Sequence, residues 1–357
     1  MKDFFKDLVV LELAGVLAGP LAGMFFAELG ARVIKVENPK IGGDVTRKWR
    51  LNSPNDRSEV SAYYASCNYN KEVHFIDLKT ETGQSEIHTL ITEADILISN
   101  FNDTVSKKLG IDYSTVKSIK GDIIYAQLYA FDPEDQRPGY DLIMQAQTGF
   151  MFMNGYPGDQ PAKMPVALID IMAAHQIKEG ILLALLRLFK TGQGSKVDVS
   201  LYQSAISSLA NQASNFLMAG HIPQPMGTLH PNIAPYGDLF KTKDNAIIIL
   251  AIGSDQQFKK LGNTLNFDDH FYNTFETNAD RLSQRESLRR HIQEQVAPLS
   301  YQELSDALHA NGIPFCKIMS LEEVFESPLA KEMILTEILN SGQKTKCVSS
   351  LAFNISE

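Results

Sequence analysis

Short apolar strands alternate with helical segments from the start of this sequence. Residues 8–13 are rich in leucine and valine, residues 20–29 have the apolar periodicity of a helix, and residues 32–36 form a second strand. Further strands are expected at 73–78, 95–99 and 122–128, separated by helical segments at 82–92 and 105–109. A succession of strand, helix and strand builds a parallel sheet with helices on both faces, so the pattern predicts an α/β fold.

The second half of the sequence predicts longer helices and then a smaller domain. Helices are expected at 140–151, 172–188 and 202–218, with a strand at 196–201 before the last of them. Between 220 and 235 the composition shifts to glycine, proline, histidine and asparagine, which is typical of a linker. The expected elements beyond it are strands at 237–242 and 246–252 and helices at 255–261, 285–295 and 301–310. The chain after the linker is therefore predicted to form a smaller α+β domain.

Length, charge and cysteine content exclude several classes of protein. The 357 residues suffice for about two domains, and the net charge of −9 without a basic tract argues against sequence-independent nucleic-acid binding. Any polyanionic ligand must therefore be held by local positive charge. The three isolated cysteines form neither a CxxC nor a Cys/His cluster, so no metal site is expected and a reducing cytoplasmic location is favoured. No apolar run approaches the roughly 18–20 residues that span a bilayer, so no membrane partner is expected.

The first strand-to-helix turn is a candidate anion site. Residues 14–20 read AGVLAGP, and a turn of this kind presents backbone N–H groups and a helix N-terminus to an anion such as phosphate. The glycines stand at 15, 19 and 23, which is not the spacing of the dinucleotide fingerprint, although Glu37 ends the second strand as the ribose-binding acid of such proteins does. Alternatively, these small residues only allow the helix to pack closely on the sheet. The sequence leaves both interpretations open.

Asp170 is the most unusual acid of the chain because apolar residues surround it. It follows MPVALI and precedes IM, at the head of a long apolar helix. One interpretation is an N-cap, in which the carboxylate accepts from free helix N–H groups. The other is a carboxylate in a dry pocket, where poor hydration makes it a stronger nucleophile toward an acyl carbon. The two interpretations are compatible.

Two further segments are candidates for the border of a site. Tyr140 and Asp141 follow Gly139 and could stand beside Asp170, although a surface turn before a helix is the ordinary explanation. His230 lies in the loop LHPNIAPYG, which is suited to a flexible cover over a site. The sequence holds no Ser/His/Asp arrangement, HExxH or Walker loop, so hydrolase, metalloprotease and NTPase functions have no support.

Taken together, eight segments in register resemble the family III CoA-transferases. This family includes formyl-CoA transferase and carnitine CoA-transferase and is related to α-methylacyl-CoA racemase. The segments are VLELAGVLAGPLAGMFFAELGARVIKVENP, GGDVTR, YNKEVHFIDLKTETG, ADILISNF, GYDLIMQAQTGFM, LIDIMAAHQIKEGILLALLRLFKTGQGSKVDVSLYQSA, HPNIAPYGDLFKTKDN and SLEEVFESP.

The resemblance implies a Rossmann-like large domain with a parallel sheet, a smaller α+β domain, and a homodimer of two interlinked chains. The expected limits are 1–219 for the large domain, with 330–357 returning to it, 220–235 for the linker and 236–329 for the small domain. The sequence ends soon after SSLAFNIS, whereas relatives usually continue into a further helical segment. Either this is a short member, or the dimer partner replaces that segment.

The resemblance also assigns site residues by position. Asp170 corresponds to the nucleophilic aspartate of the family, and Tyr140 and Asp141 are candidates for orienting the substrate. The implied CoA-binding positions are Val16, Leu17, Ala18, Asn38, Ile76, Lys79, Asn100, Phe101 and Lys108. Asn38 and Lys108 stand where arginines occur in relatives, and a lysine cannot grip a phosphate bidentately. Arg47 is a further candidate for a phosphate contact.

The implied activity is CoA transfer from an acyl-CoA to a carboxylic acid through aspartyl-anhydride and aspartyl-CoA thioester intermediates. CoA and acyl-CoA are then substrates, and neither a metal nor a permanently bound cofactor is expected. One alternative is racemisation of a 2-methylacyl-CoA, but racemases carry a histidine base where this chain has Tyr140, whose ordinary pKa of about 10 makes it a poor base. A non-catalytic CoA-binding protein is the second alternative.

Overall fold

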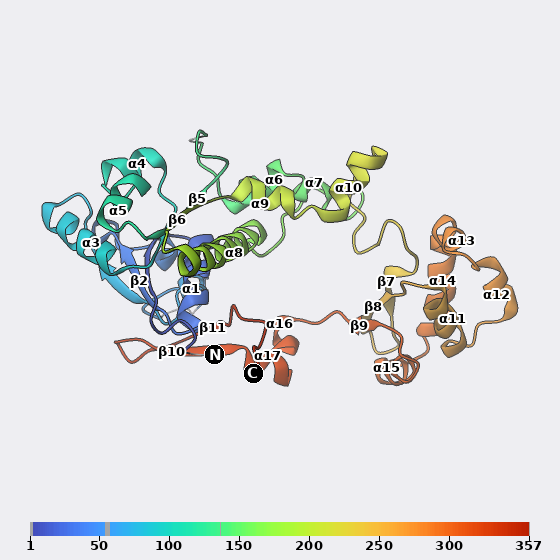
Figure 1. Ribbon diagram of the computed structural model, residues 1–357. Helices are drawn as coiled ribbons and strands as arrows, with labels where there is room; N and C mark the ends of the chain where they lie inside the picture. The colour runs from blue at the N-terminus through green and yellow to red at the C-terminus, as the bar shows by residue number, and fades with distance from the viewer. Residues whose placement is uncertain (1–2, 54–57, 136, 357) are drawn as a thin grey trace. The chain divides into compact units, whose positions relative to one another are not determined.

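The computed structural model describes residues 3–53, 58–135 and 137–356, and these form two compact units (Figure 1). Unit 1 comprises the described residues of 1–152, 163–223 and 331–357, and unit 2 those of 153–162 and 224–330. The domain limits expected from the sequence stay a prediction, because contacts within the chain do not show which part folds independently.

Unit 1 is built on a parallel sheet with the strand order β3-β2-β1-β4-β5-β6. Its strands are β1 (Val9–Leu13), β2 (Arg32–Glu37), β3 (Glu72–Phe75), β4 (Ile96–Ser99), β5 (Ile124–Tyr129) and β6 (Ser195–Ser200). Val10 pairs with Val33 of β2 on one side and with Ile96 of β4 on the other, which places β1 at the centre. This is the strand order of Rossmann folds, so the predicted α/β fold is confirmed. The third strand is shorter than expected, and the residues after Phe75 leave the sheet.

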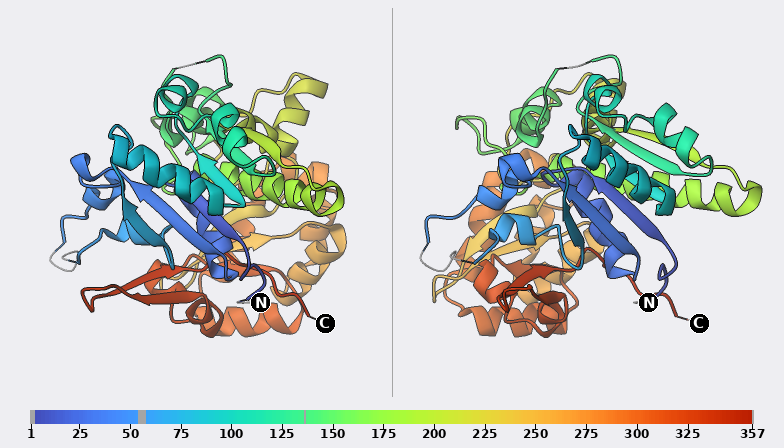
Figure 2. Two further views of the ribbon diagram at one scale, coloured as in Figure 1. Left: turned by 60° about the vertical axis from the view of Figure 1, so that its left-hand side comes forward. Right: turned by 90° about the vertical axis from the view of Figure 1, so that its left-hand side faces the viewer.

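Helices cover both faces of this sheet (Figure 2). On one face lie α1 (Ala18–Glu28) and α8 (Leu168–Thr191), and on the other α3 (Glu81–Glu93) and α5 (Tyr113–Ile119). Side chains alternate along β1, so Val10 joins the core beneath α1 and α8 while Leu11 joins the core beneath α3 and α5. Burial on both faces explains why the strands appear in the sequence as apolar runs.

The long helix α8 begins four residues earlier than the pattern predicted. The expected start was 172, but α8 begins at Leu168, and it ends at Thr191, before Gly192, which adopts a left-handed conformation with φ +68°. Ile177, Ile181 and Leu185 form an apolar stripe along α8 that is buried against the sheet. The earlier start moves Asp170 from the predicted cap position into the first turn of the helix.

Two helices that the sequence predicted as continuous are interrupted. The helix expected at 140–151 is divided into α6 (Asp141–Gln147) and α7 (Phe150–Met153). The helix expected at 202–218 is divided into α9 (Leu201–Ser207) and α10 (Ala210–Ala219), with Ala210 at φ +47°. The remaining short elements near the sheet are the 3₁₀ turns η1 (Pro39–Ile41) and η2 (Val45–Lys48) and the helices α2 (Ala62–Ala65) and α4 (Asp103–Lys108).

The rest of unit 1 is a C-terminal hairpin that the sequence analysis missed. It pairs β10 (Ile334–Ile338) with β11 (Lys344–Val348) in antiparallel register. The segment after it returns to α1, where Glu28 accepts the N–H of Ser350 at 2.8 Å. No helix in the described part of the chain has both the length and the apolar character needed to cross a membrane.

Unit 2 contains a three-stranded antiparallel sheet with the order β7-β8-β9. Its strands are β7 (Tyr236–Lys241), β8 (Ile247–Ala251) and β9 (Phe315–Lys317). The helices are α11 (Asp255–Thr264), α12 (Asp269–Thr274), α13 (Asn278–Ser283), α14 (Arg285–Val296), α15 (Tyr301–Ala310) and α16 (Leu321–Val324), and α17 (Pro328–Glu332) spans the return to unit 1. The core is built around aromatic rings, including Phe258 and Phe271, whose centroids lie 5.6 Å apart. The predicted hairpin of β7 and β8 is confirmed.

The loop around His230 is held within unit 2 by an arginine. Arg285 donates to the carbonyl oxygens of His230 at 2.7 Å and Tyr236 at 2.8 Å, and it forms an ion pair with buried Asp238 at 2.7 Å. The flexible loop expected from the glycine and proline content is therefore fastened at two backbone positions.

Candidate functional site

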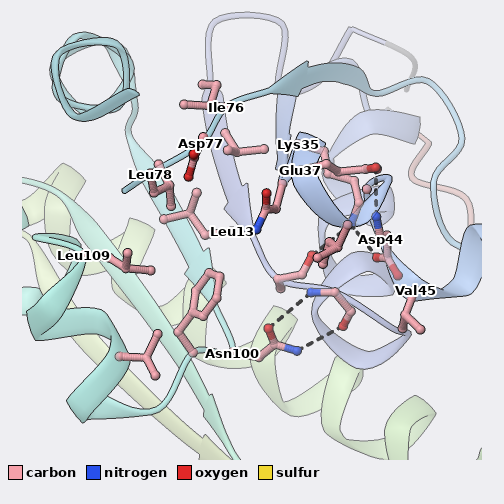
Figure 3. A pocket seen from close by; sticks show the side chains of 18 of the residues that line it. Leu13, Lys35, Glu37, Asp44, Val45, Ile76, Asp77, Leu78, Asn100 and Leu109 are labelled. Atoms are coloured by element: carbon pink, nitrogen blue, oxygen red, sulfur yellow. Dashed lines mark hydrogen bonds and ion pairs between the residues drawn. The ribbon is translucent and has the colours of Figure 1, made fainter. Parts of the chain in front are cut away.

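A cavity of about 450 Å³ opens at the carboxyl edge of the parallel sheet (Figure 3). The ends of β1 and β2 and the segments that follow β1, β2, β3 and β4 line it, including Leu13, Lys35, Ile76 and Asn100. The strand order reverses between β1 and β4, and the space beyond the carboxyl ends at such a reversal is where open α/β sheets bind ligands. The fold therefore places a ligand site at this cavity, which we call the first cavity.

The structure brings together most of the residues that the sequence assigned to CoA. The predicted positions that line the first cavity are Val16, Asn38, Ile76, Lys79, Asn100 and Phe101. Leu17 and Ala18 lie beside it at the start of α1 but are not part of its wall. Lys108 lies in the last turn of α4, between Val105 and Leu109, which both line the cavity.

The turn between β1 and α1 is fastened to the end of β4 by the side-chain amide of Asn100. Gly15 donates its N–H to Oδ1 of Asn100 at 3.2 Å, and Nδ2 of Asn100 donates to the carbonyl oxygen of Gly15 at 3.0 Å (Figure 3). The pair bridges the two strands between which the sheet order reverses. Asn100 therefore has a structural contact in addition to its position on the cavity wall.

The glycines of this turn serve different purposes. A Cβ atom at Gly19 would overlap the side chain of Ala14, and one at Gly23 would overlap the carboxylate of Glu12. These two positions support the close-packing interpretation of the small residues. Gly15 lines the first cavity, so the binding interpretation stays open there.

Glu37 and Arg47, which the sequence offered as ligand contacts, form a buried ion pair with each other. Glu37 is 4% exposed and accepts from Arg47 at 2.7 Å, from the hydroxyl of Tyr64 at 2.7 Å and from the N–H of Asp44 at 3.0 Å. Arg47 also stacks on the ring of Tyr64 at 3.9 Å. Glu37 is thus a structural acid and not a counterpart of the ribose-binding residue, and Arg47 is held by it.

Lysines supply the positive charge near the mouth of the first cavity. Asn38 caps η1 by accepting the N–H of Lys40 at 2.9 Å. Lys40 is well exposed, and its Nζ lies 2.6 Å from Oδ2 of Asp77, which lines the cavity with Lys79. Lys40 is thus paired with Asp77, and Lys79 is the lysine of the cavity wall for which no ion pair is described.

Asp170 is not the N-cap of α8, so that interpretation was wrong. The cap position belongs to Ala167, which provides no side-chain cap. Asp141 from α6 takes the role instead, because its Oδ1 accepts the N–H of Ile169 at 2.7 Å. The carboxylate of Asp170 is thereby left available for another purpose.

Asp170 is largely buried within unit 1. The residue is 7% exposed, and no donor among the described residues forms a hydrogen bond with its carboxylate. Burial, and secondly the negative charge of Asp141, raise the pKa of Asp170 to about 7. A carboxyl group whose pKa lies near neutrality and lacks hydrogen-bonding partners has the character of a reactive group in a dry pocket.

Asp141 is fixed by a network that joins α6 to the start of α8. Its second oxygen accepts from Nε2 of Gln145 at 2.7 Å, and Oε1 of Gln145 accepts the N–H of Met164 at 2.8 Å. The sequence analysis expected Asp141 beside Asp170, and the electrostatic effect on Asp170 agrees with that placement. Its predicted role in orienting the substrate stays a prediction.

Tyr63 is a neighbour of Asp170 that the sequence analysis missed. Burial, and then the charge of Asp170, raise the pKa of Tyr63 to about 12, so its phenol keeps a proton at neutral pH. The ring of Trp49 stands edge-on to it with centroids 5.0 Å apart. No local pattern marks Tyr63, because only the fold brings α2 near the start of α8.

Tyr140 lies on a second cavity of about 320 Å³ in unit 1. Val16 and Asn100 line this cavity as well as the first, so the two adjoin at the turn after β1. Tyr140 is 60% exposed and precedes α6. Tyr140 therefore lies on the cavity that shares Val16 and Asn100 with the first cavity, near the turn between β1 and α1.

Comparisons with known proteins identify the family of the chain. The model of CoA-transferase family III matches residues 5–356. A succinate–glutarate CoA-transferase of Agrobacterium fabrum is 37% identical over 337 residues, which are 92% of this chain and 83% of that protein. The human succinyl-CoA:glutarate CoA-transferase is 31% identical over 327 residues, or 90% of this chain and 73% of that protein. A crystal structure of a CaiB/BaiF family protein from Brucella suis has a TM-score of 0.83 and 34% identity, covering 98% of this chain and 92% of that chain.

The chain belongs to CoA-transferase family III, which confirms the resemblance. Its activity is that of a CoA-transferase.

Proposed function

We propose that this enzyme moves CoA from an acyl-CoA thioester to a free carboxylic acid with Asp170 as the nucleophile. The observation that carries the proposal is the carboxylate of Asp170, which is buried, lacks hydrogen-bond donors among the described residues and has a pKa raised to about 7. Poor solvation leaves the ionised form more reactive than a hydrated carboxylate. Near neutral pH a large fraction of this carboxyl group is still ionised.

The first cavity is the proposed site for CoA. Its apolar wall suits the adenine and the pantetheine arm, and Lys40 and Lys79 offer positive charge to the phosphates. Asn38 replaces the arginine expected from the resemblance, so Lys79 is proposed as a principal phosphate contact. Lys108 lies one residue beyond the cavity wall and supplies additional charge.

The proposed reaction balances without an external reductant or oxidant. Asp170 attacks the thioester carbon, the C–S bond breaks, and a mixed anhydride and the CoA thiolate form. The thiolate then attacks the aspartyl carbonyl carbon, which releases the first acid and leaves an aspartyl-CoA thioester. The acceptor carboxylate attacks that thioester, and the thiolate released in this step opens the second anhydride at the acceptor carbonyl. The new acyl-CoA leaves, and Asp170 is restored as a carboxylate.

Both intermediates must be protected from water, because hydrolysis would waste the thioester. The near-complete burial of Asp170 supports such protection. Tyr63 retains its proton at neutral pH, so its phenol is a proposed donor to the oxygen that becomes negative when the carbonyl carbon is attacked. Tyr140 and Asp141 remain proposed orienting residues.

Dicarboxylic acids are the proposed substrate class. The relatives named above act on succinate and glutarate, and another similar protein is a succinyl-CoA:mesaconate CoA-transferase of Haloarcula hispanica. Succinyl-CoA is therefore the proposed donor, and a dicarboxylate of four or five carbons the proposed acceptor.

A homodimer is proposed as the functional form. The helices α8 and α10 of unit 1 expose large apolar side chains, among them Phe189 at 78% and Met218 at 89%. Such surfaces are typical of protein–protein contacts. Measuring the oligomeric state tests the homodimer, and cross-linking tests whether the two chains interlink as the resemblance implies.

The test is a transfer assay with succinyl-CoA and a panel of carboxylic acids, read by mass spectrometry. Asp170→Asn should lower the transfer rate by more than about 10³-fold, while Asp122→Asn, at an exposed position, should not change it. Transfer by Asp170→Asn at the wild-type rate would refute the proposal. Exchange of the α-proton of 2-methylacyl-CoA with deuterated solvent, without transfer, would support the racemase alternative. Binding of CoA with neither transfer nor exchange would support a non-catalytic binding protein.

A further inference from the structure

The turn between β1 and α1 lies on a cluster of four buried charged groups. The side chains of Glu12, Lys35, Asp44 and Lys71 are each at most 2% exposed. Nζ of Lys35 lies 2.9 Å from Glu12 and 3.2 Å from Asp44, and Nζ of Lys71 lies 2.8 Å from the second oxygen of Glu12. Two carboxylates thus balance two ammonium groups, which is the condition for keeping charges in a protein interior.

Three members of this cluster form hydrogen bonds with the backbone of the turn or of the helix that follows. Lys35 donates to the carbonyl oxygen of Ala14 at 2.8 Å, and Lys71 donates to that of Pro20 at 2.7 Å. Asp44 accepts the N–H of Val16 with its Oδ2 at 3.2 Å. The cluster therefore fixes the path of the chain at the point where it borders both cavities.

Val16 has an unusual backbone conformation in this turn. Its φ is +72°, a left-handed value that glycine adopts freely but a β-branched residue adopts rarely. The residue lines both cavities, so its conformation determines the shape of their shared wall. Asp44 accepts the only hydrogen bond described for the N–H of Val16.

The side chain of Asp44 is itself fixed by hydrogen bonds and an ion pair within the protein. Oδ1 accepts the N–H of Thr46 at 3.0 Å and its hydroxyl at 2.8 Å, while Oδ2 faces Lys35 and Val16. Both oxygens are therefore oriented by fixed partners. Because the carboxylate of Asp44 is already oriented, it can keep Val16 in a strained conformation without an additional ordering cost when a ligand binds.

We propose that Asp44 is a positioning residue for CoA, which acts by keeping Val16 in the left-handed conformation that shapes the wall of the first cavity. The inference rests on the proposed function, because it requires that CoA binds there. Asp44 also lines the first cavity, and the role proposed for it is separate from any direct contact with the ligand. Its effect passes through the peptide of Val16, with Lys35 holding the carboxylate in place.

A double-mutant cycle tests this role by calorimetry with CoA and by steady-state kinetics. Asp44→Ala should weaken CoA binding about tenfold and raise the KM of the acyl-CoA by a similar factor, while kcat changes less than about threefold. Glycine adopts a positive φ freely, so in a Val16→Gly background Asp44→Ala should weaken binding less than about threefold. Additive effects of the two changes would overturn the inference.

Two further variants separate positioning from general stability. Asp44→Asn keeps the side-chain shape and one acceptor oxygen, so it should weaken CoA binding only about threefold. If the alanine variant does not fold, Asp44→Asn replaces it in the cycle, and it should then leave CoA binding unchanged in the Val16→Gly background. Lys71→Met disturbs the same cluster without touching Val16. Lys71→Met should lower the melting temperature, and its effect on CoA binding should be additive with that of Val16→Gly. If Lys71→Met and Val16→Gly were coupled in CoA binding as strongly as Asp44→Ala and Val16→Gly, the inference would be overturned.

The outcomes also distinguish this inference from the proposed function. If wild-type protein fails to bind CoA, or Asp170→Asn transfers CoA at the wild-type rate, the proposed function fails. If wild-type protein binds CoA and depends on Asp170, but Asp44 and Val16 act additively, only the positioning role fails.

Discussion

Replacing Asp170 with asparagine should stabilise the unliganded protein, and the gain should increase with pH. Burial raises the pKa of Asp170 from its ordinary 3.8 to about 7. The folded state therefore binds more protons than the unfolded state between about pH 4 and pH 7, and the protein loses stability as pH rises through that window. Asparagine has nearly the same shape and carries no charge, so it removes this loss.

The magnitude follows from the difference between the two pKa values. Each pH unit between them is worth about 1.4 kcal/mol, so ionising Asp170 in its buried site costs about 4 kcal/mol at pH 8 and about 2 kcal/mol at pH 5. The gain in the free energy of unfolding from Asp170→Asn should therefore increase by roughly 2–3 kcal/mol between pH 5 and pH 8. Because Asp170 is only 7% exposed, solvent screening reduces this figure little.

Urea denaturation of wild type and variant, at equal protein concentration and at both pH values, measures this difference. Asp122→Asn is the matched control, because the same change at an exposed position should alter the free energy of unfolding by less than about 0.5 kcal/mol at either pH. A gain from Asp170→Asn that does not depend on pH, or a loss of stability at pH 8, would refute the account of a carboxylate kept in an apolar pocket.

Three further changes have defined outcomes. Asp141→Asn removes one cause of the raised pKa of Asp170, so the acid limb of the pH profile of kcat/KM should move to lower pH, and an unchanged limb would contradict the coupling of the two carboxyl groups. Asn100→Ala removes both hydrogen bonds to Gly15, and calorimetry should show CoA binding about tenfold weaker. Unchanged CoA binding would show that these hydrogen bonds do not affect the ligand site. Gly23→Ala places a methyl group against the buried carboxylate of Glu12 and should lower the free energy of unfolding by about 1–3 kcal/mol, which urea denaturation measures, and a neutral result would show that Glu12 can move aside.

The sequence could predict the parallel sheet because each of its strands is marked by a short-range pattern. Each strand is an apolar run of the length a buried parallel strand requires. Lys79 and Asn100, which follow different strands, were assigned to one site by the family resemblance, and both line the first cavity at the carboxyl edge of the sheet.

The parts that the sequence could not predict depend on contacts between distant segments. Asp170 stands at the head of a long apolar helix, which suggested a cap, but the capping hydrogen bond is supplied by Asp141 from another helix. Tyr63 becomes a neighbour of Asp170 only after α2 and α8 are packed in the same unit. The break after Thr148 falls at Gly149, whose φ of +88° is a local signal that the sequence analysis did not use. The break near Ala210 has neither glycine nor proline to mark it.

The buried charges of β1 and β2 provided a signal that sequence reasoning did not use. Glu12, Lys35 and Glu37 interrupt strands that are otherwise apolar on both faces. Charged residues are almost never fully buried without partners, so such interruptions predict an ion-pair cluster beneath the sheet edge. The structure shows that cluster under the turn that borders both cavities.

The most direct test of the central claim is to identify the residue that carries CoA during turnover. Wild-type protein is incubated with succinyl-CoA, treated with borohydride and digested, and the peptides are analysed by mass spectrometry. Reduction of an aspartyl-CoA thioester converts the aspartate to homoserine, so the account predicts this change at Asp170 and its absence without the acyl-CoA. Modification at a different residue, or continued transfer with Asp170 unmodified under trapping conditions, would contradict the account.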